Sequence, residues 1–234
     1  MKRNVIKRLT EREHYLIRPD TYIGGIESKS MEFLILENGK FEYQTVEYVP
    51  GLLKIIEEIF DNSIDEAIRT EFQFANQITV TFNKHSIVIK DNGRGVPQDP
   101  LDDGSLMAVV AFTEPRAGTN FEEDTKADGS IGRNGIGSFA TNVFSTKFKV
   151  ITEDGTNRLE IECENNLESF DFKQSKSSKH GTIVEFFPDL KRFGCSEEDG
   201  IAPVYAKLIS QRMVHLTQMF PIKFTLVDNL NDLF

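Results

Sequence analysis

The order of hydrophobic and polar positions predicts both helices and strands, in mixed order. Apolar residues recur with a helical period from Pro50 to about Arg69, whereas Ile78–Phe82 and Ile87–Lys90 have the length and β-branched content of the two strands of a hairpin. An Asn38-Gly39 turn signal within residues 31–49 predicts another hairpin. The elements do not alternate as in a parallel doubly wound sheet, so we expect a mixed or antiparallel sheet.

The second half of the chain predicts further helices and strands. Residues 98–130 come first; they are rich in Asp, Glu, Gly and Thr with one short apolar helix near Leu106–Phe112, which is typical of a lid over a site. No repeat or linker divides the chain, so a single domain is expected. The helices are expected at about 135–144 and 202–219, and the strands near 147–152, 159–163, 170–172, 182–187 and 223–227.

Composition and charge exclude several classes of protein. The 234 residues contain no apolar run near the roughly 20 residues that a membrane helix needs, and the basic start Met1–Arg8 lacks the apolar core of a secretory signal. We therefore expect a cytoplasmic protein that does not use a membrane. A net charge of −10 argues against strong nucleic-acid binding by this chain alone. The densest basic run, Lys173–Lys179, is rich in Ser and predicts a solvated loop.

Cysteine and histidine do not indicate a site. The two cysteines, Cys163 and Cys195, are too few for a disulfide framework and form no Cys-x-x-Cys pattern. The four histidines share no spacing that suggests zinc binding, so we expect no metal held by histidine.

The predicted helix at Pro50–Arg69 has one polar and one apolar face. At ~100° per residue, four polar residues fall within a narrow arc and six apolar residues occupy the wider opposite arc. This pattern predicts a helix that buries one side against a sheet while its acidic side lines a cavity; an exposed acidic stripe is the alternative. The polar residues are Glu58, Asp61, Asn62 and Asp65, and the apolar ones are Leu52, Ile56, Ile59, Phe60, Ile64 and Ala67.

Two glycine-containing segments give this helix a functional interpretation. Asp91–Gly95 follows a predicted strand; it is either a turn or a place where Asp91 accepts a hydrogen bond from an adenine amino group and Gly95 lets the base lie against backbone. Gly132–Gly137 runs into a predicted helix, so its free N–H groups could face phosphate oxygens; a flexible loop is the alternative. The sequence contains neither a Walker A pattern nor a dinucleotide fingerprint. With Glu58-x-x-x-Asn62, these segments predict a nucleotide pocket of another kind.

The combination resembles the Bergerat-fold ATPases of the GHKL superfamily, which include type II topoisomerases, Hsp90 chaperones, MutL-type repair proteins and histidine kinases. Flanking segments are similar to the ATPase domain of type IIA DNA topoisomerases, and the mixture is most like the large subunits of T-even bacteriophages. The resemblance covers nearly the whole chain. The segments that carry it are Arg18–Gly24, Val49–Leu52, Gly132–Gly135, Phe144–Phe148 and Gly181–Pro188.

The resemblance implies one domain over residues 1–234, with an N-terminal arm at 1–24 and an ATP lid at 98–131. Its fold would be α/β, an α+β two-layer sandwich in which a mixed, mostly antiparallel sheet is covered on one face by helices. The resemblance also implies that the transducer and DNA-cleavage domains are absent, so that the chain is an isolated N-terminal piece.

The resemblance also implies roles for the matching residues, with ATP and Mg²⁺ as ligands. Glu58 is expected to be the general base that orients the water attacking the γ-phosphate, and Asn62 to bind Mg²⁺ through its amide oxygen. Asp91 and Thr182 are expected to hold adenine, partly through water. The chain should therefore bind ATP with Mg²⁺, and turn it over slowly without the transducer lysine.

The phosphates are expected to be wrapped by the backbone of the glycine-rich segment. Asn120 matches the lid position near ribose and phosphate. Lys126 would add a positive charge there, with a solvated lysine as the alternative. The residues of the wrapping segment are Gly132, Arg133, Asn134, Gly135, Ile136 and Gly137.

Partners follow from the same resemblance. ATP would clamp two copies of the subunit into a gate for duplex DNA, and other topoisomerase subunits would complete the enzyme. Aminocoumarin inhibitors are expected to compete at the adenine end, with Arg158 as a contact. Two other functions remain open: a clamp of the chaperone or mismatch-repair type, whose own flanking motifs are missing here, and a non-hydrolysing nucleotide-sensing module.

Overall fold

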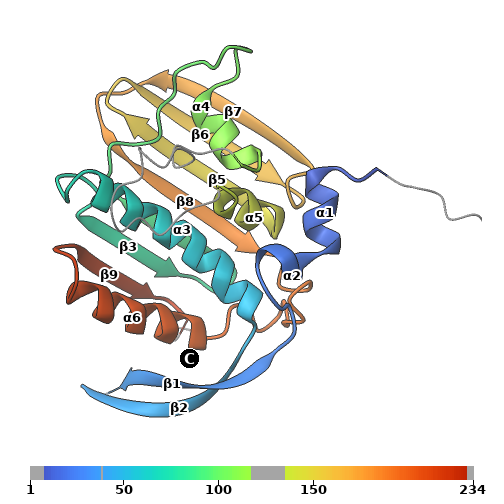
Figure 1. Ribbon diagram of the computed structural model, residues 1–234, viewed down its shortest axis with the longest axis vertical. Helices are drawn as coiled ribbons and strands as arrows, with labels where there is room; N and C mark the ends of the chain where they lie inside the picture. The colour runs from blue at the N-terminus through green and yellow to red at the C-terminus, as the bar shows by residue number, and fades with distance from the viewer. Residues whose placement is uncertain (1–7, 38, 117–134, 231–234) are drawn as a thin grey trace, which may run out of the picture.

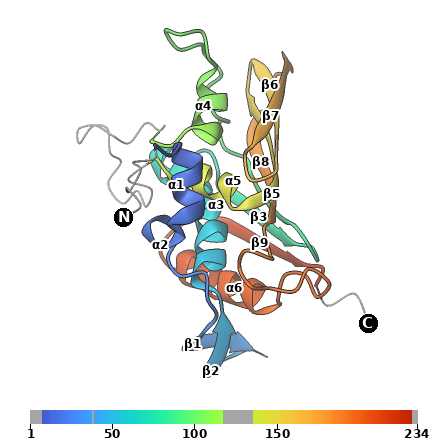
Figure 2. The same ribbon diagram turned by 90° about the vertical axis from the view of Figure 1, so that its right-hand side faces the viewer.

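The computed structural model describes residues 8–37, 39–116 and 135–230. These residues form a seven-stranded sheet with helices packed on one face, as Figure 1 and the edge-on view in Figure 2 show. Neighbouring strands are antiparallel except for β3 and β9, which are parallel, so the expected mixed sheet is confirmed. Across the sheet the order is β7 (Ser169–Lys176), β6 (Asn157–Glu164), β5 (Ser145–Asp154), β8 (His180–Pro188), β4 (Ile87–Asp91), β3 (Gln77–Phe82) and β9 (Lys223–Asp228).

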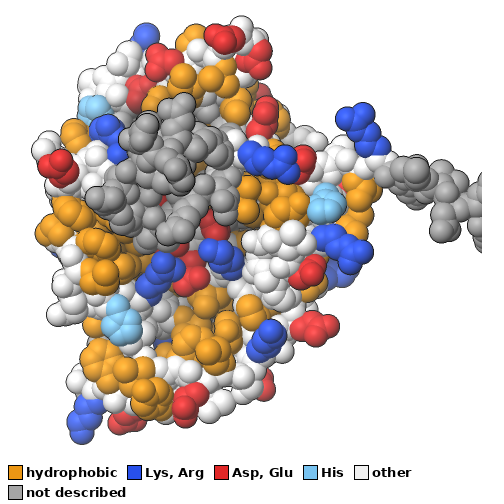
Figure 3. All heavy atoms as spheres, viewed as in Figure 1, with side chains coloured by type: hydrophobic (Ala, Val, Ile, Leu, Met, Phe, Trp, Pro, Cys, Tyr) orange, Lys and Arg blue, Asp and Glu red, His pale blue; other side chains and the backbone are white. Residues whose placement is uncertain are grey.

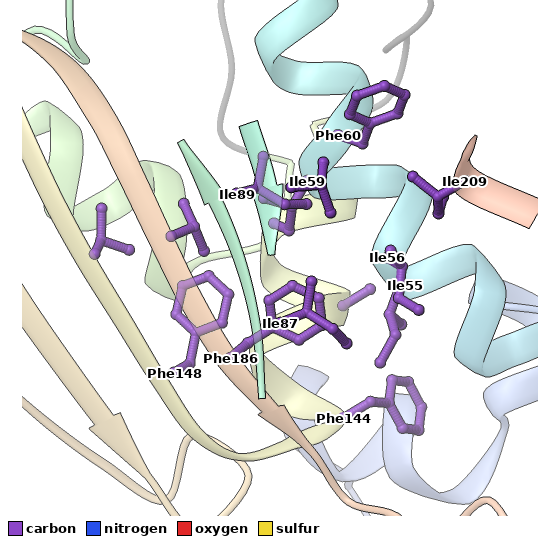
Figure 4. Close-up of a cluster of buried hydrophobic side chains, with 14 of the residues drawn as sticks. Ile55, Ile56, Ile59, Phe60, Ile87, Ile89, Phe144, Phe148, Phe186 and Ile209 are labelled. Atoms are coloured by element: carbon purple, nitrogen blue, oxygen red, sulfur yellow. The ribbon is translucent and has the colours of Figure 1, made fainter. Parts of the chain in front are cut away.

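The longest helix, α3 (Pro50–Arg69), has the bounds that the sequence predicts, with Pro50 in its first turn. The six residues of its predicted apolar arc are all at most 2% exposed. Figure 4 shows Ile55, Ile56 and Ile59 of α3 in one cluster with residues of the sheet, among them Ile87 and Phe186. Burial of each such side chain contributes roughly 1.5–3 kcal/mol, which fixes α3 against the sheet.

Shorter helices complete this layer. The predicted helices near 106–112, 135–144 and 202–219 are confirmed, whereas the two before residue 23 are not foreseen. Their sequence does contain signals: Thr10 and Glu13 form a reciprocal capping box, and Pro19 begins the second helix. The helices are α1 (Glu11–Ile17), α2 (Pro19–Tyr22), α4 (Met107–Thr113), α5 (Gly137–Val143) and α6 (Val204–Thr217).

The predicted hairpin over residues 31–49 is confirmed as β1 (Lys29–Glu37) and β2 (Lys40–Tyr48). It forms a separate two-stranded sheet that packs near α6 at one end of the molecule (Figure 1). Gly39 in its turn has φ +75°, a conformation that glycine adopts without strain.

The prediction of a loop at Lys173–Lys179 is wrong for its first four residues, because β7 continues to Lys176. The strand pairs with β6 along its whole length, from Ser169 to Lys176. It is an edge strand and all eight of its residues are exposed, so no buried face imposes a hydrophobic alternation that would reveal its full length.

Candidate functional site

Glu58 lies where α3 meets the start of α5. Lys54 Nζ is 2.5 Å from Glu58 Oε1 on one side of the carboxylate. On the other side, a Cβ atom at position 137 would lie only 1.8 Å from Glu58 Oε2, so any residue larger than Gly137 would displace the carboxylate. The expected base and the last glycine of the glycine-rich segment are therefore in contact.

Asn62 lies one turn further along α3, and its residue is exposed. Its amide nitrogen donates a hydrogen bond to Ser138 Oγ at 2.9 Å, which joins α3 to α5 a second time. Because this bond uses the nitrogen, the amide oxygen is available as an acceptor or as a ligand for a hard cation.

Asp91 ends β4 and is 8% exposed. Its Oδ2 accepts from the Ser63 hydroxyl and its Oδ1 from the Gly93 N–H, both at 2.8 Å. Burial raises the pKa of Asp91, and these two hydrogen bonds oppose the rise. In the sheet, Asp91 is paired with Thr182 of β8, which is paired with Thr152 of β5, so the three residues form one row. The two expected adenine contacts, Asp91 and Thr182, are thus neighbours.

Two residues of α3 that the sequence does not single out, Ser63 and Glu66, hold the segment after β4. Ser63 binds Asp91, and Glu66 accepts from Arg94 Nε at 2.7 Å, from its Nη2 at 3.1 Å and from its backbone N–H at 3.2 Å. The signal for Glu66 is its spacing: Glu58, Asn62 and Glu66 follow one another at intervals of four, which places all three on one flank. Ser63 carries no such signal, because a serine within a helix is common.

The backbone around Gly95 requires a glycine at this position. Its φ is +82°, and a Cβ atom there would lie 2.0 Å from the carbonyl oxygen of Glu153. The missing side chain therefore makes room for the backbone at the end of β5, in a conformation that glycine adopts most easily. The expectation that Gly95 also lets the base lie against backbone stays a prediction.

The expected single acidic face of α3 is also corrected, because the structure divides it. Asp61 is 5% exposed and its Oδ1 lies 2.7 Å from Arg212 Nη2 of α6, while Glu57 lies 2.7 Å from Arg212 Nη1. Burial raises the pKa of Asp61 to about 7, against the opposing effect of Arg212. Asp65 is 5% exposed as well. Of the four polar residues, only Glu58 and Asn62 remain accessible on the flank next to α5.

The glycine-rich segment is described only at its end. Gly135, with φ +59°, and Ile136 lead into α5, which begins at Gly137 and not at Gly135. The other expected phosphate and ribose contacts lie outside the described residues: Asn120, Lys126, Gly132, Arg133 and Asn134.

Arg158, the expected inhibitor contact, lies in β6 next to the row that contains Asp91. In the sheet it is paired with Glu153, the residue next to Thr152. Successive residues of a strand point to opposite faces, so Arg158 and the row that contains Asp91 and Thr152 lie on opposite faces of the sheet. Its guanidinium lies 2.8 Å from Glu160 and 3.6 Å from Glu153. An aminocoumarin contact at Arg158 therefore stays a prediction.

The surface adds two observations. Among the described residues on the face drawn in Figure 3, acidic and basic side chains are interspersed and form no continuous basic area of the kind that binds nucleic acid. Among the described residues, no helix combines the length and the apolar composition needed to cross a membrane.

Comparison with known sequences shows the family to which the chain belongs. A family model described as "Histidine kinase-, DNA gyrase B-, and HSP90-like ATPase" matches residues 52–186. The chain is 40% identical over 230 residues to the DNA topoisomerase large subunit of Enterobacteria phage T4, covering 96% of this chain and 43% of that subunit. It is 32% identical over 202 residues to DNA topoisomerase 2 of Saccharomyces cerevisiae, covering 82% of this chain and 14% of that protein. The chain thus spans less than half of either relative, and the resemblance drawn from the motifs is confirmed.

Solved structures agree. The ATPase region of Saccharomyces cerevisiae topoisomerase II matches with a TM-score of 0.84 and 28% identity, over 94% of this chain and 60% of that one. The ATPase and transducer domains of DNA topoisomerase II from Balamuthia mandrillaris match with a TM-score of 0.85 over 97% of this chain and 60% of that one; at 23% identity this match shows the fold alone. The expected α/β fold is confirmed.

Proposed function

Because the chain belongs to the histidine kinase-, DNA gyrase B- and HSP90-like ATPases, we propose that its site binds ATP with Mg²⁺ and hydrolyses it. In the whole protein, it would act as the ATP-operated gate of a type II DNA topoisomerase. The observation that carries the proposal is the contact between the Glu58 carboxylate and Gly137. It puts an acid that can orient water against the segment whose backbone would face the phosphates.

At the reacting end, the two oxygens of Glu58 have different surroundings. Lys54 holds Oε1, so Oε2, which lies against Gly137, is the oxygen that would accept the proton of an attacking water. Catalysis of phosphoryl transfer rests mainly on positioning and charge stabilisation, and both partners of Glu58 restrict where the carboxylate can lie.

At the adenine end, Asp91 would accept from the exocyclic amino group and Thr182 would contact the ring beside it. Asp91 Oδ1 and Oδ2 each already accept one hydrogen bond, and each oxygen of a carboxylate has two acceptor positions. The buried carboxylate is therefore oriented before a ligand arrives, which lowers the entropy cost of binding.

The residues present fit a magnesium ion that is bound together with a triphosphate. The Asn62 amide oxygen is the hard oxygen ligand that Mg²⁺ prefers, and the bond to Ser138 orients it. Among residues 8–37, 39–116 and 135–230, no group of three His, Cys, Asp or Glu side chains could hold a metal, so its other ligands would be phosphate oxygens and water. When bound, the ion would neutralise charge on the phosphates.

The gate function would require a second copy and further domains. The net charge of −10 means that duplex DNA would be held mainly by other parts of the enzyme. Sedimentation of the chain with and without a non-hydrolysable ATP analogue tests the first requirement: we expect a shift from monomer to dimer with the analogue. Dimerisation that is the same without nucleotide would contradict an ATP-operated gate.

Binding and hydrolysis are tested separately. Calorimetry with the non-hydrolysable analogue should give a saturable heat signal that depends on Mg²⁺, and no signal above noise would contradict the site. In the complete subunit, Glu58→Gln should lower the rate of ATP turnover by at least about 100-fold while the analogue still binds. Glu47→Gln, an exposed position on β2, is the matched control and should leave the rate unchanged. Turnover retained in Glu58→Gln would remove this residue from the mechanism. Binding without turnover in the unmodified subunit would favour the nucleotide-sensing module.

A further inference from the structure

Thr152 lies in β5, next to Thr182 in the row that contains the two residues assigned to adenine. It is 0% exposed and stands at the end of the row Asp91, Thr182, Thr152. Its hydroxyl oxygen is 2.8 Å from the Val96 nitrogen, which donates to it, and 3.1 Å from Thr182 Oγ1. We propose that Thr152 is a positioning residue that makes the Thr182 hydroxyl a hydrogen-bond donor toward N1 of a purine, and so contributes to the selection of adenine. The inference rests on the proposed ATP site.

The direction of the hydrogen bonds follows from counting donors. The Val96 N–H can only donate, so Thr152 Oγ1 is the acceptor in that pair. The Thr152 hydroxyl can still donate one hydrogen bond. Among the described residues, the only other partner of that hydroxyl is Thr182 Oγ1. If Thr182 donated to Thr152 instead, the Thr152 proton would be buried without an acceptor, which is unfavourable. The chain of bonds therefore runs from Val96 to Thr152 to Thr182.

The last member of this chain has a free proton. Thr182 Oγ1 accepts from Thr152, so its own proton points toward a ligand or water. The row therefore presents an acceptor at Asp91 beside a donor at Thr182. Adenine offers the complementary pair, an amino group beside the N1 acceptor. Guanine offers the O6 acceptor beside an N1–H donor. Its O6 would face the Asp91 acceptor and its N1–H would face the Thr182 donor, so neither hydrogen bond could form.

The backbone of Thr152 also fixes the position of the loop that contains Val96 and Gln98. Gln98, which is 3% exposed, donates from Nε2 to the Thr152 carbonyl oxygen and to the Asn157 carbonyl oxygen, both at 3.1 Å. Gln174 Nε2 in turn donates to Gln98 Oε1 at 3.1 Å. The position of the Val96 N–H, and with it the direction of these hydrogen bonds, is thus fixed by buried and partly buried hydrogen bonds that join the Gln98 loop to β5, β6 and β7.

The experiment compares ATP with 1-deaza-ATP, in which a C–H group replaces N1. Dissociation constants for both are measured by calorimetry on the chain, for the unmodified protein and for Thr152→Val, Thr152→Ser and Thr182→Val. The unmodified protein should bind ATP about tenfold more tightly than 1-deaza-ATP. Thr152→Val removes the hydroxyl and keeps the shape, and should reduce this ratio to about two. Thr182→Val should do the same, while Thr152→Ser keeps the hydroxyl and should retain the ratio.

The ratio separates a positioning role from a merely structural one. Loss of packing at Thr152 would weaken the binding of ATP and of 1-deaza-ATP alike and leave the ratio of their dissociation constants unchanged. An unchanged ratio in Thr152→Val would therefore overturn the inference. A ratio near one in the unmodified protein would overturn it too. If the unmodified protein binds no ATP, the proposed function itself fails, which is a distinguishable result. Melting temperatures show whether each variant is folded, and Thr152→Ala gives the same test if the valine methyl is not tolerated.

Discussion

The two flanks of α3 carry similar polar residues but differ in how the fold treats them. On the flank toward α6, Glu57 and Asp61 share the guanidinium of Arg212, at 2.7 Å each. On the flank toward α5, the Glu58 carboxylate is paired with a partly exposed lysine of its own helix, and Asn62 is exposed. Carboxylates on one helix thus differ in availability according to the helix packed beside them. The carboxylates on the flank toward α6 are engaged in ion pairs with another helix, and the polar groups on the flank toward α5 are available for a ligand.

Removal of Arg212 is the strongest way to break this comparison. Arg212→Ala leaves two carboxylates one helical turn apart, one of them buried, without their shared cation. Breaking such a buried pair costs about 3 kcal/mol of unfolding free energy, and urea unfolding at pH 8 measures it. Arg158→Ala, on the outer face of the sheet, is the control and should cost less than about 1 kcal/mol. Equal losses of unfolding free energy in the two variants would contradict a specific stabilising role for Arg212 on the flank toward α6.

A change on the other flank should affect activity and not stability. Gly137→Ala places a methyl group where Glu58 Oε2 lies, so the carboxylate must move while the helix start gains a better helix former. We expect ATP turnover in the complete subunit to fall by about 100-fold, since small displacements of a catalytic group have effects of that size. The melting temperature should stay the same or rise. Undiminished turnover would contradict the contact as a determinant of Glu58 geometry.

The pH dependence of stability sharpens the comparison further. The pKa of Asp61 is raised to about 7 in the folded protein, above its ordinary value near 4, so the folded state holds this proton more tightly than the unfolded state. This contribution to stability is complete below pH 4 and is lost as pH rises through 7. Between pH 5.5 and 7.5 the loss should be roughly 1–2 kcal/mol.

Asp61→Asn provides the test of that pH dependence, because it removes the titrating group and keeps its size. Urea unfolding at several pH values should show a flatter profile for the variant between pH 5.5 and 7.5. Glu160→Gln, at an exposed position, should keep the original profile. A variant profile parallel to that of the unmodified protein would exclude Asp61 as the titrating group.

The smallest expected effect is at the end of the ligand-facing flank. Glu66→Gln weakens the paired hydrogen bonds to Arg94, which is partly exposed, so we expect a loss of about 1 kcal/mol in stability. Because Glu66 holds the segment after Asp91, the dissociation constant of the ATP analogue should rise about threefold. Calorimetry measures the second effect, and an unchanged constant would limit Glu66 to a structural role.

Much of the fold could be predicted because local patterns and tertiary packing agree. The apolar arc of α3 has a helical period, and every residue predicted for it is buried. The Asn38-Gly39 signal marks a real hairpin, and Gly135 does precede a helix that begins at Gly137. In contrast, β7 is longer than predicted because its exposed residues leave no pattern, and α1 depends on a cap between Thr10 and Glu13 that a search for hydrophobic periods overlooks.

The sequence by itself determined which residue types meet on the flank of α3 toward α5, because helical geometry places Glu58, Asn62 and Glu66 on one side whatever surrounds them. Only the tertiary structure decided that Asp61 is buried against Arg212, that Gly95 makes room for the backbone of β5, and that the Thr152 hydroxyl meets that of Thr182. These outcomes depend on contacts between segments far apart in the chain. Spacing along one helix or strand contains no information about which side chain from elsewhere will fill the space beside it.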